Sequence, residues 1–447
     1  MERGANMVST GHLLVLCMLL SVALAAITNS FVRENVIEES QVGVHWALIV
    51  AGSNGYYNYR HQADICHAYQ ILHSNGIPDE RIVVMMYDDI AYSEENPTQG
   101  IIVNHINGSD VYRGVPKDYT QEDVTPENFL KILQGDEDGM KGIGSGKVIK
   151  SGPNDDVFVN FADHGAPGIV AFPSGELTAS ALNDAIQSMH DARKYKKMVF
   201  YVEACESGSM FSNLLPTNIS VYATTAANGE ESSYACYYDD FRDTYLGDVY
   251  SVMWMEDSDV ADLSKETLTQ QYQTVKQKTN TSHVMRFGDE SMGTLPLIKF
   301  EGDGKSAIAK PLQEQKTVPL DAIPSPDVKL SILSKRWTKA PTEADRHKYH
   351  ALIKQELKLR EYIDTRMRQV VDFATKSTEQ ADRIMSVRHQ LRDHDCYEPV
   401  MHHFSTTCFP LHKVEYALRQ LYTLVNLCEE NIPPSMTIEA IDVACLH

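Results

Sequence analysis

The chain has 447 residues, of which 43% are hydrophobic, and this is enough to bury a large core in two or three domains. The hydrophobic content excludes a disordered acidic tail. The net charge of -21 at pH 7 excludes a protein that binds nucleic acid through a basic surface, because phosphate backbones are bound by dense Lys and Arg.

A short apolar stretch near the start, Leu13–Ala26, is rich in Leu and Ala and ends in small residues. This pattern is typical of a secretory signal peptide, and the stretch is too short to span a membrane comfortably. A retained anchor or a buried helix is the alternative. We predict a signal peptide over residues 1–26 and a short propeptide over residues 27–44. Three glycosylation sequons fit the same secretory route, with acceptors at Asn107, Asn218 and Asn280.

Residues 45–300 alternate between strand-like and helix-like segments, which predicts an α/β domain with a mostly parallel sheet flanked by helices. The predicted strands are His45–Ala51, Ile82–Tyr87, Val157–Phe161, Met198–Val202 and Val221–Thr225. The predicted helices are Arg60–Ser74, Pro126–Leu133, Thr178–Arg193 and Lys265–Gln277. We expect the long polar stretch Ser93–Asp156 to pack over one edge of the sheet.

The pattern changes after the α/β domain. Residues 301–328 are rich in Pro, Lys and Gln without apolar periodicity, which predicts an exposed linker that proteases can cut, and we extend this linker to residue 345. Residues 346–447 show helical periodicity only and predict a separate all-α domain. From Lys329 to the end the chain has 17 Lys and Arg and 16 Asp and Glu, a net charge of +1, so residues 1–328 carry −22 and the two parts can attract each other.

Four cysteines cluster in the helical domain, and they predict two disulfides among Cys396, Cys408, Cys428 and Cys445. Three pairings are possible, and the sequence does not choose among them. A zinc site is the alternative, but the close Cys pairs of zinc modules are missing. Beyond the signal peptide, Cys66, Cys205 and Cys236 remain unpaired. An odd number of unpaired cysteines in a secreted protein is consistent with one free catalytic thiol.

Two predicted strands each lead into a reactive side chain. Val157–Phe161 precedes His164, and Met198–Val202 precedes Cys205. Because the carboxyl ends of parallel strands open on one edge of a sheet, these side chains are expected to lie close together. An imidazole can take a proton from a thiol and pass it to a leaving amine, so the pair predicts a Cys/His hydrolase. Gly165 would allow close backbone approach to a substrate.

Longer motifs resemble those of the legumains, or asparaginyl endopeptidases, which are cysteine proteases with a caspase-like α/β fold. The similarity extends from about His45 to the C-terminus and includes Asn58-Tyr-Arg-His-Gln-Ala-Asp64, Asp163-His-Gly165, Glu203-Ala-Cys-Glu-Ser-Gly208 and Tyr222-Ala-Thr-Thr-Ala-Ala-Asn228. The resemblance implies that Cys205 is the nucleophile, His164 the general base and then acid, and Asn58 the residue that orients the imidazole. The backbone amides of Gly165 and Cys205 would form the oxyanion hole. No cofactor and no metal are expected.

The resemblance also implies cleavage after Asn, and more slowly after Asp in acid. The pocket for this side chain maps onto Arg60, His61, Glu203, Ser233 and Asp248. An Asn amide needs a donor and an acceptor opposite it, and a guanidinium and carboxylates can supply both. Asp163 is expected to modulate a transpeptidase side activity. In isolation these residues have simpler explanations, such as a surface ion pair or a helix N-cap at Asn58.

The helical domain resembles the legumain prodomain, which implies a zymogen that is activated at low pH in a lysosome, an endosome or a digestive vacuole, or after secretion. Cystatin-type inhibitors are the further partners that the family implies. We expect four basic residues to face the acidic α/β domain: Lys335, Arg336, Arg360 and Arg366. No Asn lies between Asn280 and Asn426, so the candidate activation sites are Asp321, Asp327 and Arg336.

Three other classes of protein share part of this pattern. The catalytic subunit of the GPI-anchor transamidase would need a membrane span, and no apolar segment of that kind follows Leu411. A caspase would carry Gln in place of Glu203 before the Ala-Cys pair. A catalytically silent binding or inhibitor protein on the same scaffold would not need an intact Cys205, His164 and Asn58.

Overall fold

The computed structural model describes residues 43–304 and 321–446. The chain divides into two units, Met1–Val44 and His45–His447. The predicted signal peptide and nearly all of the predicted short propeptide lie outside the described residues. Within these residues, no helix is both long enough and apolar enough to cross a membrane.

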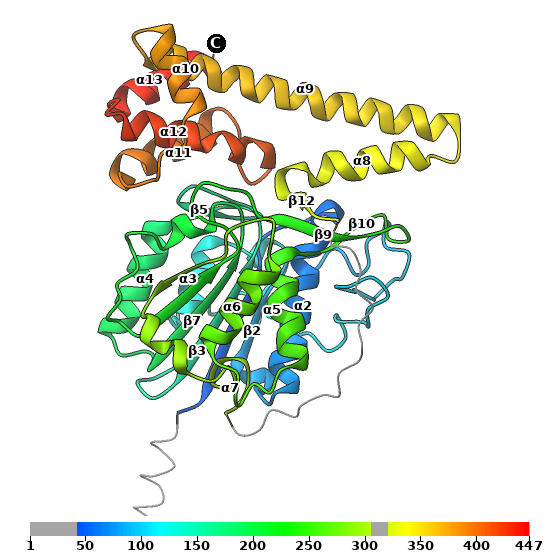
Figure 1. Cartoon of the computed structure of the whole chain (residues 1–447), viewed down its shortest axis with the longest axis vertical. Helices are drawn as coiled ribbons and strands as arrows, with labels where there is room; N and C mark the ends of the chain where they lie inside the picture. Colours follow the sequence, from blue (N-terminus) through cyan, green and yellow to red (C-terminus); the bar gives the residue numbers. More distant parts are fainter. Residues whose placement is uncertain (1–42, 305–320, 447) are drawn as a thin grey trace, which may run out of the picture. The chain divides into compact units, whose positions relative to one another are not determined.

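A six-stranded sheet forms the centre of the α/β domain, in the order β11-β8-β7-β3-β1-β2 (Figure 1). Five strands run parallel: β1 (His45–Ala51), β2 (Ile82–Met85), β3 (Asp156–Ala162), β7 (Lys197–Glu203) and β8 (Val221–Thr225). Only the edge strand β11 (Met285–Gly288) is antiparallel. The predicted fold class and all five predicted strands are confirmed. The inner strands are buried on both faces, which explains their continuous apolar runs.

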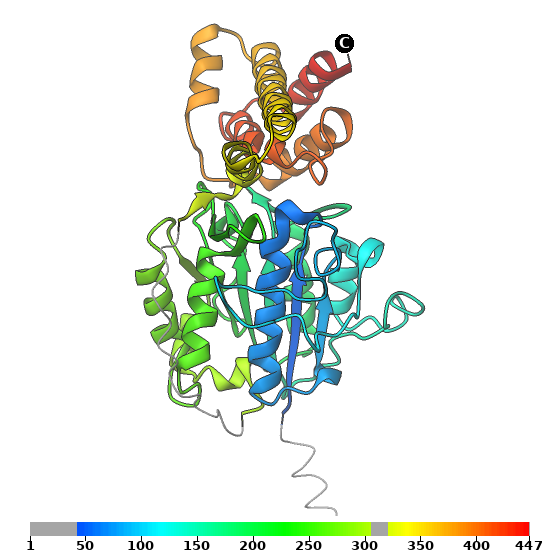
Figure 2. The same ribbon diagram turned by 90° about the vertical axis from the view of Figure 1, so that its right-hand side faces the viewer.

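Helices cover both faces of this sheet (Figures 1 and 2). One face packs against α2 (Tyr59–Ser74), α5 (Val249–Val260) and α6 (Leu268–Lys278), and the other packs against α3 (Pro126–Leu133) and α4 (Ala179–Asp191). Successive β1 residues divide between the two cores, with Ile49 in one and Leu48 in the other. Helix α5 was not predicted because it is buried nearly all round and lacks an amphipathic period.

Three of the predicted helices, α3, α4 and α6, begin at a Thr cap, whereas Asn58 precedes α2 without a side-chain cap hydrogen bond. Thr125 caps α3 by accepting a hydrogen bond from the N–H of Asn128, and Pro126 fills the first helical position. Thr178 caps α4 in the same way. The polar stretch 93–156 packs at the sheet edge as expected, because the N–H of Tyr119 donates to Val84 of β2 at 3.1 Å.

Two small sheets were not predicted, because their strands are too short to show a period. One contains β4 (Gly165–Ala166), β5 (Ile169–Phe172) and β6 (Gly175–Thr178), and the other contains β9 (Tyr234–Asp239), β10 (Thr244–Asp248) and β12 (Ile323–Pro324). Shorter helical turns complete the α/β domain: η1 (Tyr56–Asn58), η2 (Asp79–Arg81), η3 (Gln121–Asp123), η4 (Ser207–Met210), η5 (Glu290–Thr294) and α7 (Ile298–Glu301).

The end of the predicted linker is not exposed, which corrects the sequence interpretation. Residues 305–320 lie outside the described chain, but β12, the turn η6 (Ser325–Asp327) and helix α8 (Val328–Lys339) are ordered elements. Val328 and Ile332 of α8 pack against Tyr238 and Tyr245 of the β9–β10 hairpin. These apolar contacts with the α/β domain explain why the segment is folded rather than free.

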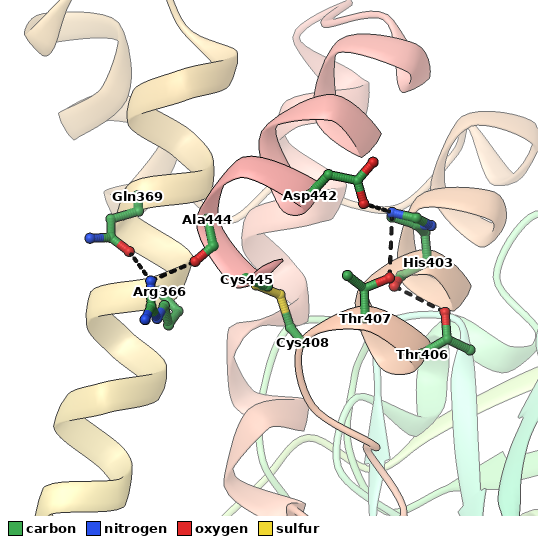
Figure 3. The surroundings of a disulfide bond; sticks show 9 residues. All are labelled: Arg366, Gln369, His403, Thr406, Thr407, Cys408, Asp442, Ala444 and Cys445. Atoms are coloured by element: carbon green, nitrogen blue, oxygen red, sulfur yellow. Dashed lines mark hydrogen bonds and ion pairs between the residues drawn. A yellow bond between two sulfur atoms is a disulfide. The ribbon is translucent and has the colours of Figure 1, made fainter. Parts of the chain in front are cut away.

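The remaining helices form the all-α domain: α9 (Glu343–Ala374), α10 (Thr378–Ser386), α11 (His394–Thr407), η7 (Glu415–Gln420), α12 (Leu421–Glu429) and α13 (Pro434–Leu446). The structure selects one of the three possible disulfide pairings. Cys396 pairs with Cys428, and Cys408 pairs with Cys445. The second bond ties the end of α11 to α13, beside an ion pair between His403 and Asp442 (Figure 3). The predicted sequon acceptors are all exposed at Asn107, Asn218 and Asn280.

The Cys408–Cys445 bond gives a test of this domain. Replacing both cysteines with Ala should lower the free energy of opening of α11 and α13 by about 2–4 kcal/mol, because the bond closes a chain segment with a separation of 37 residues. Amide hydrogen exchange of the full chain measures this opening. Reduction of the unmodified protein should reproduce the change, and unchanged protection in α13 would show that the bond adds no stability.

Candidate active site

The two reactive side chains follow neighbouring strands at the same edge of the sheet. Strands β3 and β7 pair in parallel with Ala162 opposite Glu203, and His164 and Cys205 each come two residues later. A Cβ atom on Gly165 would lie 2.4 Å from the carbonyl oxygen of Cys205. The loops that carry the imidazole and the thiol are therefore packed closely, and only glycine fits at position 165.

Asn58 and Glu415 both contact the ring of His164. The Oδ1 atom of Asn58 lies 2.9 Å from Nε2 of His164, and the same nitrogen lies 3.4 Å from Oε2 of Glu415. The Nδ2 group of Asn58 also donates to Oε1 of Glu415 at 2.6 Å. Asn58 therefore orients the ring from one side, while a carboxylate of the all-α domain holds both residues.

Charge and burial oppose each other at this pair. Burial favours the neutral ring, but the carboxylate of Glu415 outweighs burial and raises the pKa of His164. Burial likewise favours the neutral Glu415, but His164 and Asn58 outweigh it and bring the pKa of Glu415 down to about 2. The carboxylate of Glu415 therefore favours the protonated form of the ring, which cannot accept a proton from a thiol.

The thiol of Cys205 contacts Ser233. The N–H of Ser233 points at Sγ from 3.4 Å, and its hydroxyl lies 3.7 Å away. Burial, with a further contribution from the charge of Glu206, raises the pKa of Cys205 to about 12. Burial therefore favours the neutral thiol at Cys205, while Glu415 favours the protonated ring at His164. Neither form is the one that nucleophilic attack needs.

Arg60 lies in a buried cluster of charged residues, the expected pocket for a substrate side chain. Nε of Arg60 donates to Oδ1 of Asp248 at 2.9 Å, and the N–H of Asp248 donates to Oδ2 of Asp64 at 3.3 Å. Glu203 accepts from the N–H of Ser251 at 2.9 Å with one carboxylate oxygen, while the other has no hydrogen-bond partner among the described residues. At most 1% of Arg60 or of each of the three acids is exposed.

The charges in this pocket do not balance if every group is ionised. Burial raises the pKa values of Asp64, Glu203 and Asp248, and repulsion between them adds to the shifts of Asp64 and Glu203. One guanidinium cannot balance three buried carboxylates, so burial and repulsion favour the protonated form of these acids. The pocket therefore offers both hydrogen-bond donors and acceptors to a ligand side chain.

His61 connects the pocket to the loop of His164. Its Nδ1 lies 2.7 Å from the hydroxyl of Ser53 and 3.3 Å from Oδ1 of Asp163, and its Nε2 lies 3.6 Å from Asp248. Burial lowers the pKa of His61 well below its usual value, whereas burial raises the pKa of Asp163 to about 7. Among the described residues, His61, Asp163 and His164 hold atoms of metal-binding type within 4.8 Å of one another, and their contacts within the protein account for them.

The chain's own residues 323–325 fill the groove beside the pocket. Strand β12 pairs antiparallel with β9, with Ile323 opposite Ala235, and the N–H of Ser325 donates to the carbonyl of Ser233 at 2.9 Å. Nη2 of Arg60 donates to the hydroxyl of Ser325 at 2.6 Å. A segment between the two domains therefore lies in the groove as an added strand and places a short polar side chain in the pocket.

The predicted site residues are largely brought together, with one difference. Arg60, His61, Glu203 and Asp248 surround one pocket, whereas Ser233 contacts Cys205 and Ser325. The sequence interpretation missed Asp64, although it lies one turn from Arg60 on the same helix and so faces the same way. It also missed Ser53, Ser325 and Glu415. No sequence pattern around Glu415 indicates its contact with His164, because Glu415 belongs to the all-α domain.

The expectation about the basic residues needs correction. Of the four basic residues expected to face the α/β domain, Arg336 forms ion pairs of 2.9 and 2.7 Å with Glu95 and Asp243. Lys335 lies over a tyrosine ring of β9. The prediction is wrong for the other two, because Arg360 pairs with Asp327 and Glu356, and Arg366 binds a carbonyl of α13 (Figure 3).

Comparisons with known proteins agree with this geometry. The model of the Peptidase C13 family matches residues 45–303, and the model of the legumain prodomain matches residues 351–445. The chain is 54% identical to Legumain of Homo sapiens, over 90% of this chain and 93% of the relative. It is 43% identical to the vacuolar-processing enzyme delta-isozyme of Arabidopsis thaliana, over 91% of each. It is also 43% identical to Hemoglobinase of Schistosoma japonicum, over 90% of this chain and 92% of the relative.

Glu415 provides a test of the protonation pattern. In the full chain, Glu415→Gln should lower the pKa of His164, because the carboxylate that raises it is replaced by a neutral amide. Titration of the ring signal by NMR of histidine-labelled protein measures this. Glu439→Gln, an exposed carboxylate of the same domain, is the matched control. An unchanged titration in Glu415→Gln would show that the carboxylate does not act on the ring.

Proposed function

The chain belongs to the peptidase C13 family of cysteine endopeptidases, and from this we propose that it cleaves peptide bonds after Asn, and after Asp in acid. The observation that carries the specificity is the buried pocket around Arg60. Its guanidinium can donate to the side-chain carbonyl of Asn, and Glu203 and Asp248 can accept from the NH₂ group. An ionised Asp in the substrate would be repelled by these acids, because both carry negative charge. A protonated Asp is neutral and resembles Asn, so it can bind.

The reaction would use the two loops at the edge of the sheet. Once Glu415 has left, His164 loses the charge that keeps it protonated and can take the proton of Cys205. The sulfur attacks the carbonyl carbon after Asn, and the N–H groups of Gly165 and Cys205 stabilise the oxyanion. His164 then gives its proton to the leaving amine, and water hydrolyses the thioester. An amine in place of water would give ligation, which Asp163 is proposed to modulate.

The all-α domain would keep this enzyme inactive in three ways. Glu415 holds the base in its protonated form, residues 323–325 fill the groove, and Leu411 and Leu418 line the small space beside His164. The hydroxyl of Ser325 takes the position proposed for the substrate amide, opposite Arg60. Pro326 then occupies the position after the cleaved bond, so this segment resembles a substrate that is not cut.

The Glu415–His164 pair does not itself explain release in acid. Because its pKa is depressed, Glu415 stabilises the docked all-α domain at pH values above the usual pKa of a Glu carboxyl. This stabilisation is lost as the pH falls through the depressed value of about 2. The raised pKa of His164 gives stability at low pH, which is lost as the pH rises through the raised value. With 38% of the Glu415 side chain exposed, solvent also screens the pair. We therefore assign acid release to other ion pairs, such as those of Arg336.

The proposed setting is an acidic vacuole or lysosome, which the legumain and vacuolar-processing relatives suggest. Activation would require a cut between the two domains. Asp321, Asp327 and Arg336 remain the candidate sites, and cystatin-type inhibitors remain a proposed class of partner. In the described state the carboxylates of Asp321 and Asp327 are held by other contacts rather than by Arg60, so a cut at either would follow release of the segment.

Peptides that differ only at the residue before the cut test the pocket. At pH 7, kcat/KM for Asp should be roughly a hundredfold below that for Asn, because a buried like charge is costly. At pH 4.5 the difference should shrink to roughly tenfold or less, because the substrate carboxyl becomes neutral. The acid-treated protein is assayed beside its Cys205→Ser variant. Equal cleavage of the two peptides at both pH values would contradict the pocket.

The segment in the groove offers a second test. Ser325→Asn together with Pro326→Ala should create a self-cleavage site after residue 325, because an Asn amide would then face Arg60 with an ordinary peptide bond following. Mass spectrometry of the full chain after acid treatment detects the new terminus. Ser325→Asn alone, which keeps Pro326, is the matched control and should be cut far more slowly. A double variant that gains no cut at 325 would mean that the segment does not lie as a substrate does.

A further inference from the structure

The edge of β9 that faces β12 contains an unusual backbone turn. Tyr237 has a positive φ of 60°, and the pairing of β9 with β10 includes Cys236 and Tyr238 but omits Tyr237. A non-glycine residue in the left-handed region turns its own N–H group and the next one toward the same side. Two successive N–H groups that converge in this way form a nest that binds anions.

A carboxylate of the same chain occupies this nest. Oδ1 of Asp321 accepts from the N–H of Tyr237 at 2.9 Å and from the N–H of Tyr238 at 3.3 Å, and Oδ2 accepts from Tyr238 at 3.2 Å. Burial raises the pKa of Asp321, and the charge of Lys335, which lies over the ring of Tyr238, opposes this shift. The amides of Tyr237 and Tyr238 are the hydrogen-bond donors to this carboxylate. Backbone amides do not discriminate between the side chains that carry a carboxylate.

Asp321 lies just before β12 with a positive φ of 43°, so its place is counted from the paired residues. Ile323 lies opposite Ala235, and Ser325, two residues later, faces Arg60. Asp321 is consequently four residues before the residue in the pocket. A substrate that binds along β9 in the same register would place its own fifth residue, counted back from and including the cleaved Asn, at the nest.

We propose that the amides of Tyr237 and Tyr238 form an anion subsite for substrates, which selects an acidic side chain four residues before the cleaved Asn. This inference rests on the proposed cleavage after Asn and adds a second determinant of specificity. The α/β domain carries a large negative charge, so long-range electrostatics disfavour acidic peptides. A preference for acid at one position would therefore have to come from a local contact such as this nest.

Peptides with one movable charge test the proposal on the acid-treated protein at pH 6, where a peptide Asp is ionised. Moving Asp from three to four residues before Asn should raise kcat/KM roughly five- to tenfold, mainly through KM, at constant net charge. Gln at the fourth position, which adds no second cleavage site after Asn, should behave like the displaced Asp. Equal kcat/KM for all three peptides would overturn the subsite.

Variants of the nest give a second readout. Tyr238→Pro removes one of the two N–H donors on an edge-facing position, whereas Tyr238→Ala keeps the donor and removes the ring. The preference for Asp over Gln at this fourth position should fall toward one in Tyr238→Pro and remain in Tyr238→Ala. A preference lost only in Tyr238→Ala would assign the effect to the tyrosine ring and contradict the nest.

The full chain tests the contact without any turnover. In Asp321→Asn, amide exchange at Tyr237 and Tyr238 should become faster than in the unmodified protein, while Asp327→Asn should leave these amides unchanged. Unchanged exchange in Asp321→Asn would overturn the nest. A protein that cleaves no Asn peptide but shows this faster exchange would contradict the proposed function and leave the anion-binding nest supported.

Discussion

The burial of Arg60 among three acids is the constraint on which the rest of the site depends. A guanidinium removed from water needs carboxylates around it, and Asp248 supplies the direct partner at 2.9 Å. Asp64 and Glu203 add more negative charge than one guanidinium can balance, so burial and repulsion keep part of the acids protonated. A pocket with this composition donates and accepts at once. It matches a carboxamide better than it matches a carboxylate, a cation or an apolar side chain.

The all-α domain contacts the proposed catalytic residues through a charged group as well as through apolar side chains. Glu415 contacts both His164 and Asn58, and the added strand places Ser325 against Arg60. The base and the pocket are therefore blocked by different parts of the same covering domain. The α/β domain can keep its complete active geometry in the zymogen, because removal of two contacts would restore both the base and the pocket.

Much of the α/β fold could be predicted from the sequence, since buried parallel strands such as Val221–Thr225 give continuous apolar runs. The juxtaposition of His164 and Cys205 follows from that topology, whereas the pocket and the role of Asn58 were implied by family resemblance. Helix α5 was missed because it is buried nearly all round, and β12 because two residues show no period. Glu415 and Ser325 could not be predicted, because each acts through tertiary contacts that no local pattern records. The disulfide pairing was open for the same reason.

The most direct measurement of the central claim is covalent trapping of the thiol by a peptide ketone that ends in Asn. After acid treatment, such a reagent should modify Cys205 and not the buried Cys66 or Cys236, and it should react far faster than the same ketone ending in Ala. Before acid treatment the reaction should be slow, because Glu415 and the added strand are in place. Equal rates for the Asn and Ala reagents, or modification at another cysteine, would contradict an Asn pocket beside a Cys205 nucleophile.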